Sequence, residues 1–539
     1  MSRIKRALLS VSDKTGLAEL ARTLVENSIE IVSTGGTAKV LREAGIPVID
    51  IASLTGHAEA FGGRVKTLSF EIASALLFNR EKNSAEAESL GIKPIDLLVS
   101  NLYPFEKTAK TGAELAELIE EIDIGGVTLI RAAAKNAQFV TVLTGPGDYS
   151  DFQKELSASE GCISEETRMT LMRRAFHHVA DYDAIIADTL DERAGISSKR
   201  MAFDRGTELR YGENPQQKAR CFINRKASDP FRLIQGKDLS YTNLLDLYSA
   251  VYTAGSLPET ISQSRHVCAI VKHGNPCGFA CAQTGIEAFK LAWAGDQVSA
   301  FGSVIAFNRP LDLETIAAMN LADPDRSKRK FIEIVAAPSF AEGAKEMLAA
   351  QSSLRMIEWH GATPDKTRHL IGEILLEQDF DGAISENFDQ VTSSPVLLPG
   401  ESKDLIQFGI RAAARIMSNA IVIVRSDAAG NLQLLGMGAG QPNRVTSVRL
   451  AVEKAIENLT LEAEINSCDP VGHVKDQLAK ALLVSDAFFP FADSMDLCSK
   501  HGISRVIQPG GSIRDKEVIA RANELGIGMA LTGNRHFRH

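Results

Sequence analysis

The chain has 539 residues, a length that predicts roughly two to four domains, each with its own buried core. Hydrophobic residues make up 44% and charged residues 24%, as in ordinary globular proteins. The formal net charge of −9 argues against the broad basic face that nucleic-acid binding needs, although local cations can still bind an anionic small molecule. We therefore expect a globular protein that acts on small molecules and binds no nucleic acid.

Three features of the sequence predict a cytoplasmic location. No apolar run approaches the roughly 18 residues of a membrane helix, so we expect no membrane contact. The opening MSRIKRALLSVSDKTG lacks the apolar stretch and cleavage site of a signal peptide. The seven cysteines are odd in number and scattered, which favours reduced thiols over a disulfide framework.

The first 150 residues alternate between strand and helix patterns. The apolar run 7–11 predicts a strand, and the spacing of Leu17, Leu20, Ala21 and Leu24 predicts a helix after it. Strands at this spacing imply an α/β fold, with a mostly parallel sheet covered on both faces. The other predicted elements are strands at 29–32, 47–51, 95–100 and 139–143, and helices through Leu41 and near 115–122.

Three predicted strand ends carry residues suited to binding a phosphate. Ligands of such sheets bind beyond the carboxyl ends of the strands. The second strand runs into a TGGT sequence that opens a helix, where N–H groups and the helix dipole favour an anion. A plain turn or cap explains any one of these ends, but three at one edge favour a binding site. The residues are Ser10, Ser12 and Lys14 after the first strand, Thr34, Gly35, Gly36 and Thr37 after the second, and Asn101 and Tyr103 after the fourth.

Further chemically useful side chains lie in two nearby segments. A glycine turn at 62–63 precedes Arg64, Lys66 and Thr67. A predicted short helix has an acid, Asp123, at one end and a base, Lys135, at the other. Taken alone, each of these is most simply a solvated charge.

Together these motifs resemble the inosine monophosphate (IMP) cyclohydrolase domain of the bifunctional purine-biosynthesis family PurH. The resemblance covers about residues 1–150 and implies a methylglyoxal-synthase-like fold that closes the second purine ring by loss of water. The matching motifs are SVSDKTG (10–16), STGGTAK (33–39), LTG (54–56), GGRVKTL (62–68), NLYPF (101–105) and DIGGVTLIRAAAKN (123–136).

The resemblance also implies residue roles in ring closure. General acid/base catalysis and oxyanion stabilisation would come from Lys66, Tyr103, Asp123 and Lys135. The nucleotide- and phosphate-binding positions would be Ser10, Ser12, Lys14, Thr34, Gly35, Gly36, Thr37, Arg64, Thr67, Asn101, Gly125 and Gly126.

One segment departs from the family pattern. The family follows RVKTL with a histidine-proline pair and then a histidine-glycine-glycine patch, whereas this chain has Ser69, Phe70, Ala73, Ser74 and Ala75 there. An alternative reading is therefore an active formyltransferase whose cyclohydrolase domain is impaired or only binds nucleotide.

The stretch 164–194 has helical periodicity and ends at Gly195, which predicts a helical connection and a domain boundary near residue 200. His177 and His178 lie in it. Adjacent helix positions point about 100° apart, so a surface or packing role is favoured over a shared metal.

Beyond the boundary, the apolar strand 267–271 runs into Lys272, His273 and a Gly-Asn-Pro turn. A cation and an imidazole at the end of a rigid strand are what a catalytic loop needs. A capped strand with an exposed histidine is the simpler alternative for this segment alone.

Two further patterns in this half resemble known ligand sites but lack essential parts. Pro276-Cys277 followed by Cys281 is one residue longer than the PCxxC of zinc deaminases, and no HxE precedes it, so we predict no metal. A zinc-dependent nucleobase deaminase remains the alternative. The glycines of 436–440 lack the spacing and acidic residue of a dinucleotide loop, so we predict a tight turn there.

Nine ordered motifs are similar to the formyltransferase domain of the same family. The similarity implies two tandem cytidine-deaminase-like α/β subdomains without zinc, and a homodimer with sites at the subunit interface. It implies formyl transfer from the co-substrate 10-formyltetrahydrofolate to aminoimidazole carboxamide ribotide (AICAR), which gives the formylated intermediate FAICAR. The predicted domains are thus 1–200 for ring closure of FAICAR to IMP and 201–539 for formyl transfer. The motifs are LRYGENP (209–215), YTNLLD (241–246), VKHGNPCG (271–278), SAFGSVIAFNR (299–309), SNAIV (418–422), GMGAGQPNRV (436–445), SDAFFPFADS (485–494), QPGGSIRD (508–515) and TGNRHFRH (532–539).

By this resemblance His273 is the base or proton relay, and Lys272 and Asn419 position or stabilise developing charge. Ser303, Met417 and Ala492 depart from the bacterial pattern, and segment 345–405 matches it poorly. The implied substrate-binding positions are Arg210, Tyr211, Phe301, Gly302, Arg444, Phe488, Asp493, Arg535 and Phe537.

Overall fold

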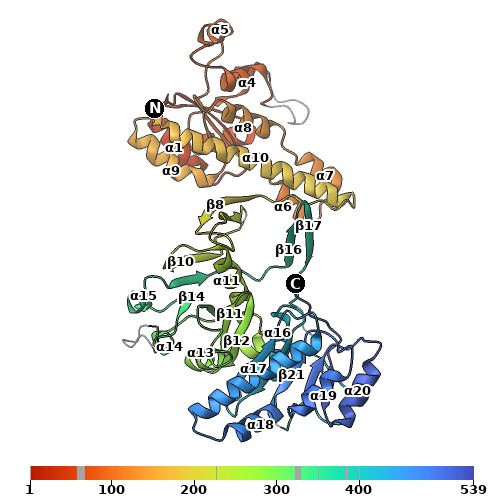
Figure 1. Cartoon of the computed structure of the whole chain (residues 1–539). Helices are drawn as coiled ribbons and strands as arrows, with labels where there is room; N and C mark the ends of the chain where they lie inside the picture. Colours follow the sequence, from red (N-terminus) through yellow and green to blue (C-terminus); the bar gives the residue numbers. More distant parts are fainter. Residues whose placement is uncertain are drawn as a thin grey trace. The chain divides into compact units, whose positions relative to one another are not determined.

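The computed structural model describes residues 2–57, 67–225, 227–321, 329–349, 351–382, 387–399 and 401–539. Contacts divide the chain into two units, Met1–Ala202 and Phe203–His539, which we describe one at a time (Figure 1). Within the described ranges, no helix combines the length and the apolar character needed to cross a membrane.

Unit 1 is built on a five-stranded sheet in which every pair of neighbours is parallel. Its strands are almost entirely buried, as expected for a parallel sheet covered on both faces. The predicted α/β fold is confirmed. The strand order is β4 (Ile49–Asp50), β3 (Glu30–Ser33), β2 (Arg6–Ser10), β5 (Leu97–Ser100) and β6 (Thr141–Leu143).

Helices cover both faces of this sheet because alternate strand residues supply two separate cores. Leu8 and Leu98 pack in the core formed with α4 (Phe70–Leu77), α8 (Gly125–Lys135) and α10 (Glu165–Arg193). Leu9 and Val99 pack in the core formed with α1 (Leu17–Glu26), α2 (Gly35–Glu43) and α9 (Tyr149–Ala158). The smaller elements are β1 (Ser2–Arg3), α3 (Ala52–Thr55), α5 (Ser84–Ser89), α6 (Phe105–Lys110), α7 (Leu115–Glu120), η2 (Pro146–Asp148) and β7 (Cys162–Ile163).

Unit 2 contains a twelve-stranded sheet made of two halves with the same pattern. Counted outward from the junction between β12 and β20, the neighbours pair antiparallel, antiparallel, parallel, parallel and antiparallel in each half. This repeat agrees with two tandem α/β subdomains. The first half is β12 (Asn275–Ala282), β11 (His266–Lys272), β13 (Ser303–Phe307), β14 (Ile332–Ala337), β15 (Arg355–Trp359) and β10 (Phe231–Gln235); the second is β20 (Leu432–Gly438), β19 (Ile421–Ser426), β21 (Leu482–Ser485), β22 (Arg505–Gln508), β23 (Gly528–Leu531) and β18 (Asp389–Gln390).

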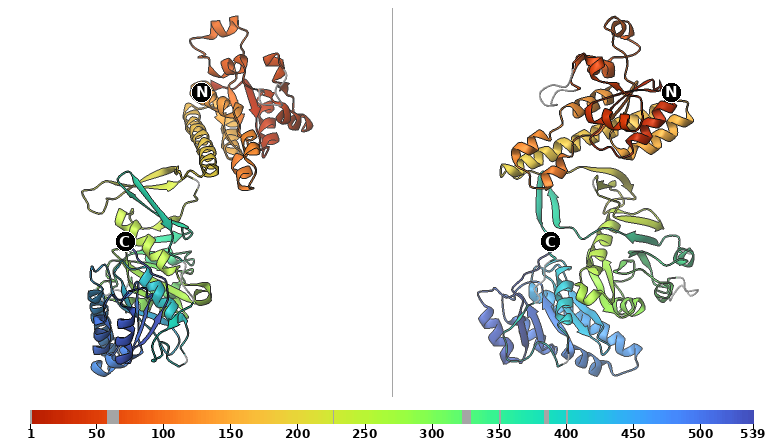
Figure 2. Two further views of the ribbon diagram at one scale, coloured as in Figure 1. Left: turned by 90° about the vertical axis from the view of Figure 1, so that its right-hand side faces the viewer. Right: turned by 180° about the vertical axis from the view of Figure 1, so that it is seen from behind.

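One core runs through both halves of unit 2, under α11 (Tyr241–Ala254) and α16 (Asp404–Ala414). On the opposite face each half has its own core and helices, and Figure 2 draws the helices of the first half in green and those of the second half in blue. The first set is α13 (Gly285–Trp293), α14 (Leu313–Ala318) and α15 (Ala344–Leu348); the second is α17 (Arg444–Ile465), α18 (Pro470–Lys480), α19 (Asp493–Lys500) and α20 (Asp515–Glu524).

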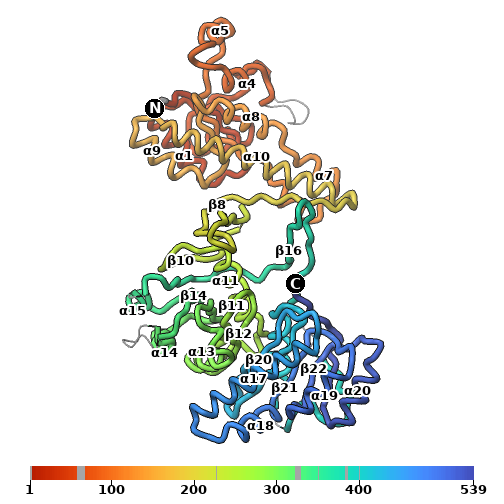
Figure 3. The backbone as a smooth tube through the Cα atoms, viewed as in Figure 1, coloured from red at the N-terminus to blue at the C-terminus, as the bar shows by residue number. Residues whose placement is uncertain are grey.

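Unit 2 also contains two hairpins that are not part of the twelve-stranded sheet. A hairpin of β8 (Phe203–Leu209) and β9 (Ala219–Asn224) begins the unit, and α12 (Glu259–Ser262) precedes β11. A second hairpin, β16 (Lys366–Ile371) with β17 (Ile374–Asp379), extends away from the sheet (Figure 3). It belongs to the stretch 345–405, where the family motifs match poorly.

The tight turn predicted for the glycines of 436–440 is wrong for two of them. Gly436 and Gly438 lie within β20, where a Cβ atom would overlap the carbonyl oxygens of Ala451 and Ser447 on α17. These glycines therefore let a helix backbone pack directly on the strand. Only Gly440, with φ of 65°, has the backbone of a turn.

Candidate active sites

The ends of β2 and β3 form a corner in unit 1 whose groups are suited to an anion. The Oγ atoms of Ser10 and Thr34 lie 3.2 Å apart, so Thr34 bonds across the sheet and makes no side-chain cap on α2. The first residues of α2, Gly35 and Gly36, are exposed. An open helix N-terminus beside hydroxyls favours a phosphate. Thr37 completes the corner, where its Oγ1 accepts the N–H of Val11 at 3.2 Å.

Asn101, at the end of β5, fixes the loop that follows β2. Its Oδ1 accepts the N–H groups of Ser12 at 2.5 Å and Asp13 at 2.9 Å, and its Nδ2 donates to the Asp13 carbonyl at 3.0 Å. The Lys14 ammonium donates to the Ser12 carbonyl at 3.3 Å and to the Val11 carbonyl. Burial lowers the pKa of Lys14, and Asp13 opposes that shift. The three strand ends predicted to meet do meet.

Asp123 lies at the N-terminal end of α8, at the same edge of the sheet. Its carboxylate accepts the N–H of Gly126 at 2.7 Å and the N–H of Tyr103. Burial raises the pKa of Asp123, and these two hydrogen bonds partly offset the rise. A Cβ on Gly126 would lie 2.6 Å from Asp123 Oδ2, and one on Gly125 would lie 2.8 Å from Thr67 Oγ1. The close approach requires both glycines.

Tyr182 is a site-supporting residue that the sequence analysis missed. Its hydroxyl accepts the backbone N–H of Asp123 at 2.9 Å and donates to the Glu121 carbonyl at 3.1 Å. It lies on α10, which the sequence predicted only as a connecting helix. No pattern within the helix indicates that this one hydroxyl reaches the site.

One predicted cation, Lys135, lies away from this arrangement. Lys135 is the last residue of α8, ten residues after Gly125, which is about 15 Å along the helix axis. The neighbouring Asn136 donates to the Leu76 carbonyl at 2.7 Å, at the far edge of the sheet from Asp123. The single chain therefore does not bring Lys135 and Asp123 together. Lys66 and Arg64 lie outside the described residues.

In unit 2, Lys272, His273 and Gly274 form the turn between β11 and β12. His273 and Gly274 both have positive φ, 53° and 72°, as in the tight turns that join two strands of a hairpin. The His273 side chain is exposed. Asp246 on α11 accepts the N–H of Gly274 at 2.6 Å and the N–H of His273. Burial raises the pKa of Asp246, and these bonds oppose the rise. The Lys272 ammonium donates to the Phe301 carbonyl at 2.6 Å.

Asn419 is held across the junction from this turn. Its Oδ1 accepts Nη2 of Arg444 at 2.6 Å, and its Nδ2 donates to the Gln441 carbonyl at 2.7 Å. An amide nitrogen has two N–H groups, so Asn419 keeps one donor beyond this bond. Asn275 Oδ1 accepts the N–H of Met417 at 3.0 Å, which ties the start of β12 to the Asn419 loop.

Arg444, which was predicted to bind substrate, is buried and bonded to protein groups. Its Nη1 donates to Ser485 Oγ at 2.9 Å and to Asp486, and its Nη2 donates to Asn419. These bonds use three of the five N–H groups of the guanidinium. The bond to Asn419 fixes which side of that amide donates.

The other predicted binding residues of unit 2 are mostly exposed around these two loops. The Arg210 guanidinium lies 5.0 Å from the centre of the Tyr211 ring, and Arg535 lies 4.4 Å from that of Phe537. Phe301 is 60% exposed, and Gly302 donates its N–H to the Phe331 carbonyl at 2.7 Å. Exposed aromatic and guanidinium groups suit a planar, anionic ligand.

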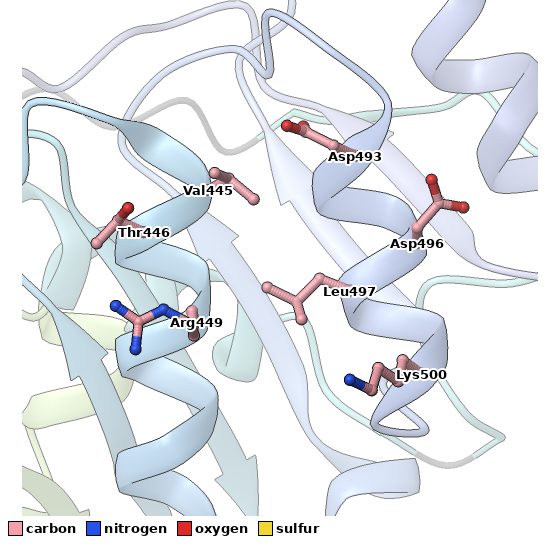
Figure 4. Close-up of a pocket in the computed structure, with 7 residues that line it drawn as sticks. All are labelled: Val445, Thr446, Arg449, Asp493, Asp496, Leu497 and Lys500. Atoms are coloured by element: carbon pink, nitrogen blue, oxygen red, sulfur yellow. The ribbon is translucent and has the colours of Figure 1, made fainter.

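Asp493 lies apart from that group, at a pocket of about 390 Å³ between α17 and α19 (Figure 4). The pocket contains none of the predicted catalytic residues. Phe488 is partly buried in the loop before α19. The pocket is lined by Val445, Thr446, Arg449, Asp493, Asp496, Leu497 and Lys500.

Cys277 and Cys281, the pair that resembles a zinc motif, pack in cores on opposite faces of the sheet. A bulge at the start of β12 separates them, so the two thiols cannot bind one ion. Among the described residues, no group of three or more His, Cys, Asp or Glu side chains is arranged to hold a metal.

Comparison with known proteins finds two family models that match successive parts of the chain. A family model described as MGS-like domain matches residues 16–128, and one described as AICARFT/IMPCHase bienzyme matches residues 133–454. The chain belongs to the AICARFT/IMPCHase bienzyme family. An AICARFT/IMPCHase bienzyme joins AICAR formyltransferase and IMP cyclohydrolase, so this chain catalyses the final two steps of IMP synthesis and uses a folate co-substrate.

Individual relatives of this bienzyme match along its whole length. The chain is 40% identical to the bifunctional purine biosynthesis protein PurH of Persephonella marina, over 99% of this chain and all of the relative. It is 41% identical to PurH of Mesorhizobium japonicum, over 99% of this chain and 97% of the relative. A solved structure titled "Crystal structure of ForH" is 34% identical over 36% of this chain and all of that one, with a TM-score of 0.33.

Proposed function

We propose that the two reactions are divided between the two units, with ring closure at the β2–β3–β5 edge of unit 1 and formyl transfer between loops of the two halves of unit 2, where β12 begins. The observation that carries this assignment is the gathering of the motif residues at one edge of each sheet. Asn101 and Asp123 mark the first edge, and His273 and Asn419 mark the second.

For ring closure, the α2 N-terminus, Ser10 and Lys14 would hold the nucleotide phosphate. The carboxamide nitrogen attacks the formyl carbon and loses one proton as the C–N bond forms. The C–O bond then breaks as the formamido nitrogen loses its proton, and the oxygen leaves with both protons as water. Asp123, with its raised pKa, is suited to take the nitrogen proton, and the Tyr103 hydroxyl can supply a proton to the leaving oxygen. Lys66 and Arg64 would act at this site, and Lys135 would need to come from a second copy of the chain.

For formyl transfer, the AICAR amine is a poor nucleophile because its electrons delocalise into the ring. His273 would take its proton as nitrogen attacks the formyl carbon of 10-formyltetrahydrofolate. The spare N–H of Asn419 and the Lys272 ammonium would stabilise the tetrahedral oxyanion. The bond from carbon to the folate N10 then breaks, N10 takes a proton, and FAICAR and tetrahydrofolate are released.

The substrates and products are thus small molecules: AICAR, FAICAR, IMP and folate. We propose that no metal takes part, that the protein is cytoplasmic, and that it forms a homodimer. Exposed binding residues such as Arg210, Arg535 and Phe537 are consistent with a transformylase site completed at a subunit interface.

The formyl-transfer assignment is tested with His273→Ala. We expect loss of tetrahydrofolate release from AICAR and 10-formyltetrahydrofolate, with unchanged conversion of supplied FAICAR to IMP. His369→Ala, an exposed histidine on β16, is the matched control and should keep both rates. An equal loss of both activities in His273→Ala would contradict separate sites.

The segment Ser69–Ala75, which departs from the family pattern, concerns the ring-closure activity. Ser69 caps α4 by accepting the N–H of Ile72 at 3.2 Å, and Ile72, Ala75 and Leu76 are buried. These residues therefore form a capped helix, α4, that packs beside α8. Supplied FAICAR should close to IMP well above the uncatalysed rate. Closure at only the uncatalysed rate would support the alternative of an impaired, nucleotide-binding domain.

A further inference from the structure

Arg538 makes contacts on both sides of the proposed transformylase junction. Its Nη1 donates to the Gly274 carbonyl at 2.9 Å and to the Arg415 carbonyl, and its Nη2 lies 3.5 Å from Ser249 Oγ. Ser249 itself donates to the same Gly274 carbonyl at 2.8 Å. The turn that carries His273 is thus held on one side by Asp246 and on the other by Arg538.

The backbone of Arg538 binds the other catalytic loop. Its N–H donates to Ser418 Oγ at 3.1 Å, and its carbonyl accepts the N–H of Ser418 at 2.9 Å. Ser418 Oγ also donates to Asp486 at 2.6 Å, which pairs with Arg444. Since Ser418 directly precedes Asn419, one residue connects the two loops that the formyl transfer needs side by side.

The charges around Arg538 show that directed hydrogen bonds hold its guanidinium. Burial lowers the pKa of Arg538, and burial lowers that of neighbouring Arg415 to about 10. The two cations lie close together, and Arg415 donates to the Asp381 carbonyl at 2.8 Å. Arg538 is therefore held by directed bonds to carbonyl oxygens, which require the planar guanidinium, and not by simple attraction to a carboxylate.

We propose that Arg538 is a positioning residue for formyl transfer: it holds the Lys272–His273 turn and the Asn419 loop in register and does not touch substrate. The inference rests on the roles proposed above for His273 and Asn419. The sequence motif pointed to its neighbours Arg535 and Phe537, which are exposed, and left Arg538 unassigned.

The first test compares Arg538→Ala and Arg538→Lys with Arg521→Ala, which removes a partly exposed arginine of α20 that pairs with Asp496 of α19. We expect Arg538→Ala to lower kcat for formyl transfer by about 10- to 100-fold, with the two KM values little changed, because the catalytic groups are misplaced. Ring closure in the same protein should keep its rate. Added ethylguanidine should partly restore Arg538→Ala, and Arg538→Lys should be intermediate.

A double variant separates positioning from other roles. If Arg538 acts by positioning the His273 turn, Arg538→Ala should lower the residual formyl-transfer rate of His273→Ala by a much smaller factor than it lowers the wild-type rate. A fully additive loss, a wild-type rate for Arg538→Ala, or failure of ethylguanidine to restore any activity would overturn the proposal. If Arg538→Ala does not fold, the same comparison is made with Arg538→Lys, alone and combined with His273→Ala. A fully active His273→Ala would instead refute the proposed function.

Discussion

Two aspartates with raised pKa values do different work in the two sites. Asp246 is buried, and its carboxylate is used by the N–H groups of the His273 turn. Asp123 accepts two N–H groups as well, but it is only partly buried and lies beside the corner suited to an anion. The Asp246 carboxylate therefore holds the His273 turn, whereas the Asp123 carboxylate is the one that we propose for proton transfer.

The raised pKa of Asp123 predicts how stability and activity respond to its replacement. The folded protein holds the proton more tightly than the unfolded chain, so the ionised carboxylate costs stability as pH rises through the folded pKa. Asp123→Asn removes that cost and keeps an acceptor for one N–H. We expect its Tm at pH 7 to 8 to be no lower than that of the wild type, with ring closure lost. A clear fall in Tm would show that Asp123 is chiefly structural.

Gly126 gives a second prediction for the same carboxylate. In Gly126→Ala the new Cβ would lie 2.6 Å from Asp123 Oδ2, so the carboxylate must move. We expect ring closure to fall by about tenfold or more, because a displacement of about 1 Å in a catalytic group can cost that much. Formyl transfer should stay unchanged. Gly147→Ala, where a Cβ meets nothing within 4 Å, is the control and should keep both rates.

Between elements, the contact of β20 with α17 supports Asn419. Ser447 on α17 donates to the Asn419 carbonyl at 2.9 Å, and the same residue's carbonyl would overlap a Cβ on Gly438. Gly438→Ala should therefore push α17 from the strand and reduce the free energy of unfolding by about 1–3 kcal/mol. Formyl transfer should fall with it. An unchanged unfolding midpoint would contradict the close approach.

Elements that depend on local patterns could be predicted from the sequence. Buried parallel strands are continuous apolar runs, so the strand of 7–11 was located within one residue of β2, Arg6–Ser10. The meeting of Ser10, Thr34 and Asn101 followed from the rule that parallel strands end at one edge.

Features that depend on distant partners could not be predicted in the same way. The role of Arg444 depends on Asp486, 42 residues along the chain, which no local pattern indicates. Glycine permits either a turn or the close approach of another backbone. The sequence around Gly436 and Gly438 does not tell which of the two applies. Lys135 was grouped with Asp123 by motif, although the helix between them separates the two residues.

On the scale of the whole molecule, each unit has its own sheet, its own cores and its own proposed site. In unit 2 the strand pattern is repeated, and the proposed site lies between loops of the two halves, where β12 begins and Asn275 accepts the N–H of Met417. Loops from both halves are needed there. In unit 1 the proposed site is built at one edge of a single sheet, from strand ends and the start of α8. The two reactions should therefore fail independently when one site is altered.

The most direct measurement of this separation uses two variants of the full chain, His273→Ala and Asp123→Asn, alone and mixed. From AICAR and 10-formyltetrahydrofolate, we predict that His273→Ala makes very little FAICAR but still closes supplied FAICAR. Asp123→Asn should release FAICAR and make little IMP. A mixture of the two proteins should make IMP at a rate approaching the wild type. Loss of both reactions in either variant, or a mixture that makes no IMP, would contradict two separate sites.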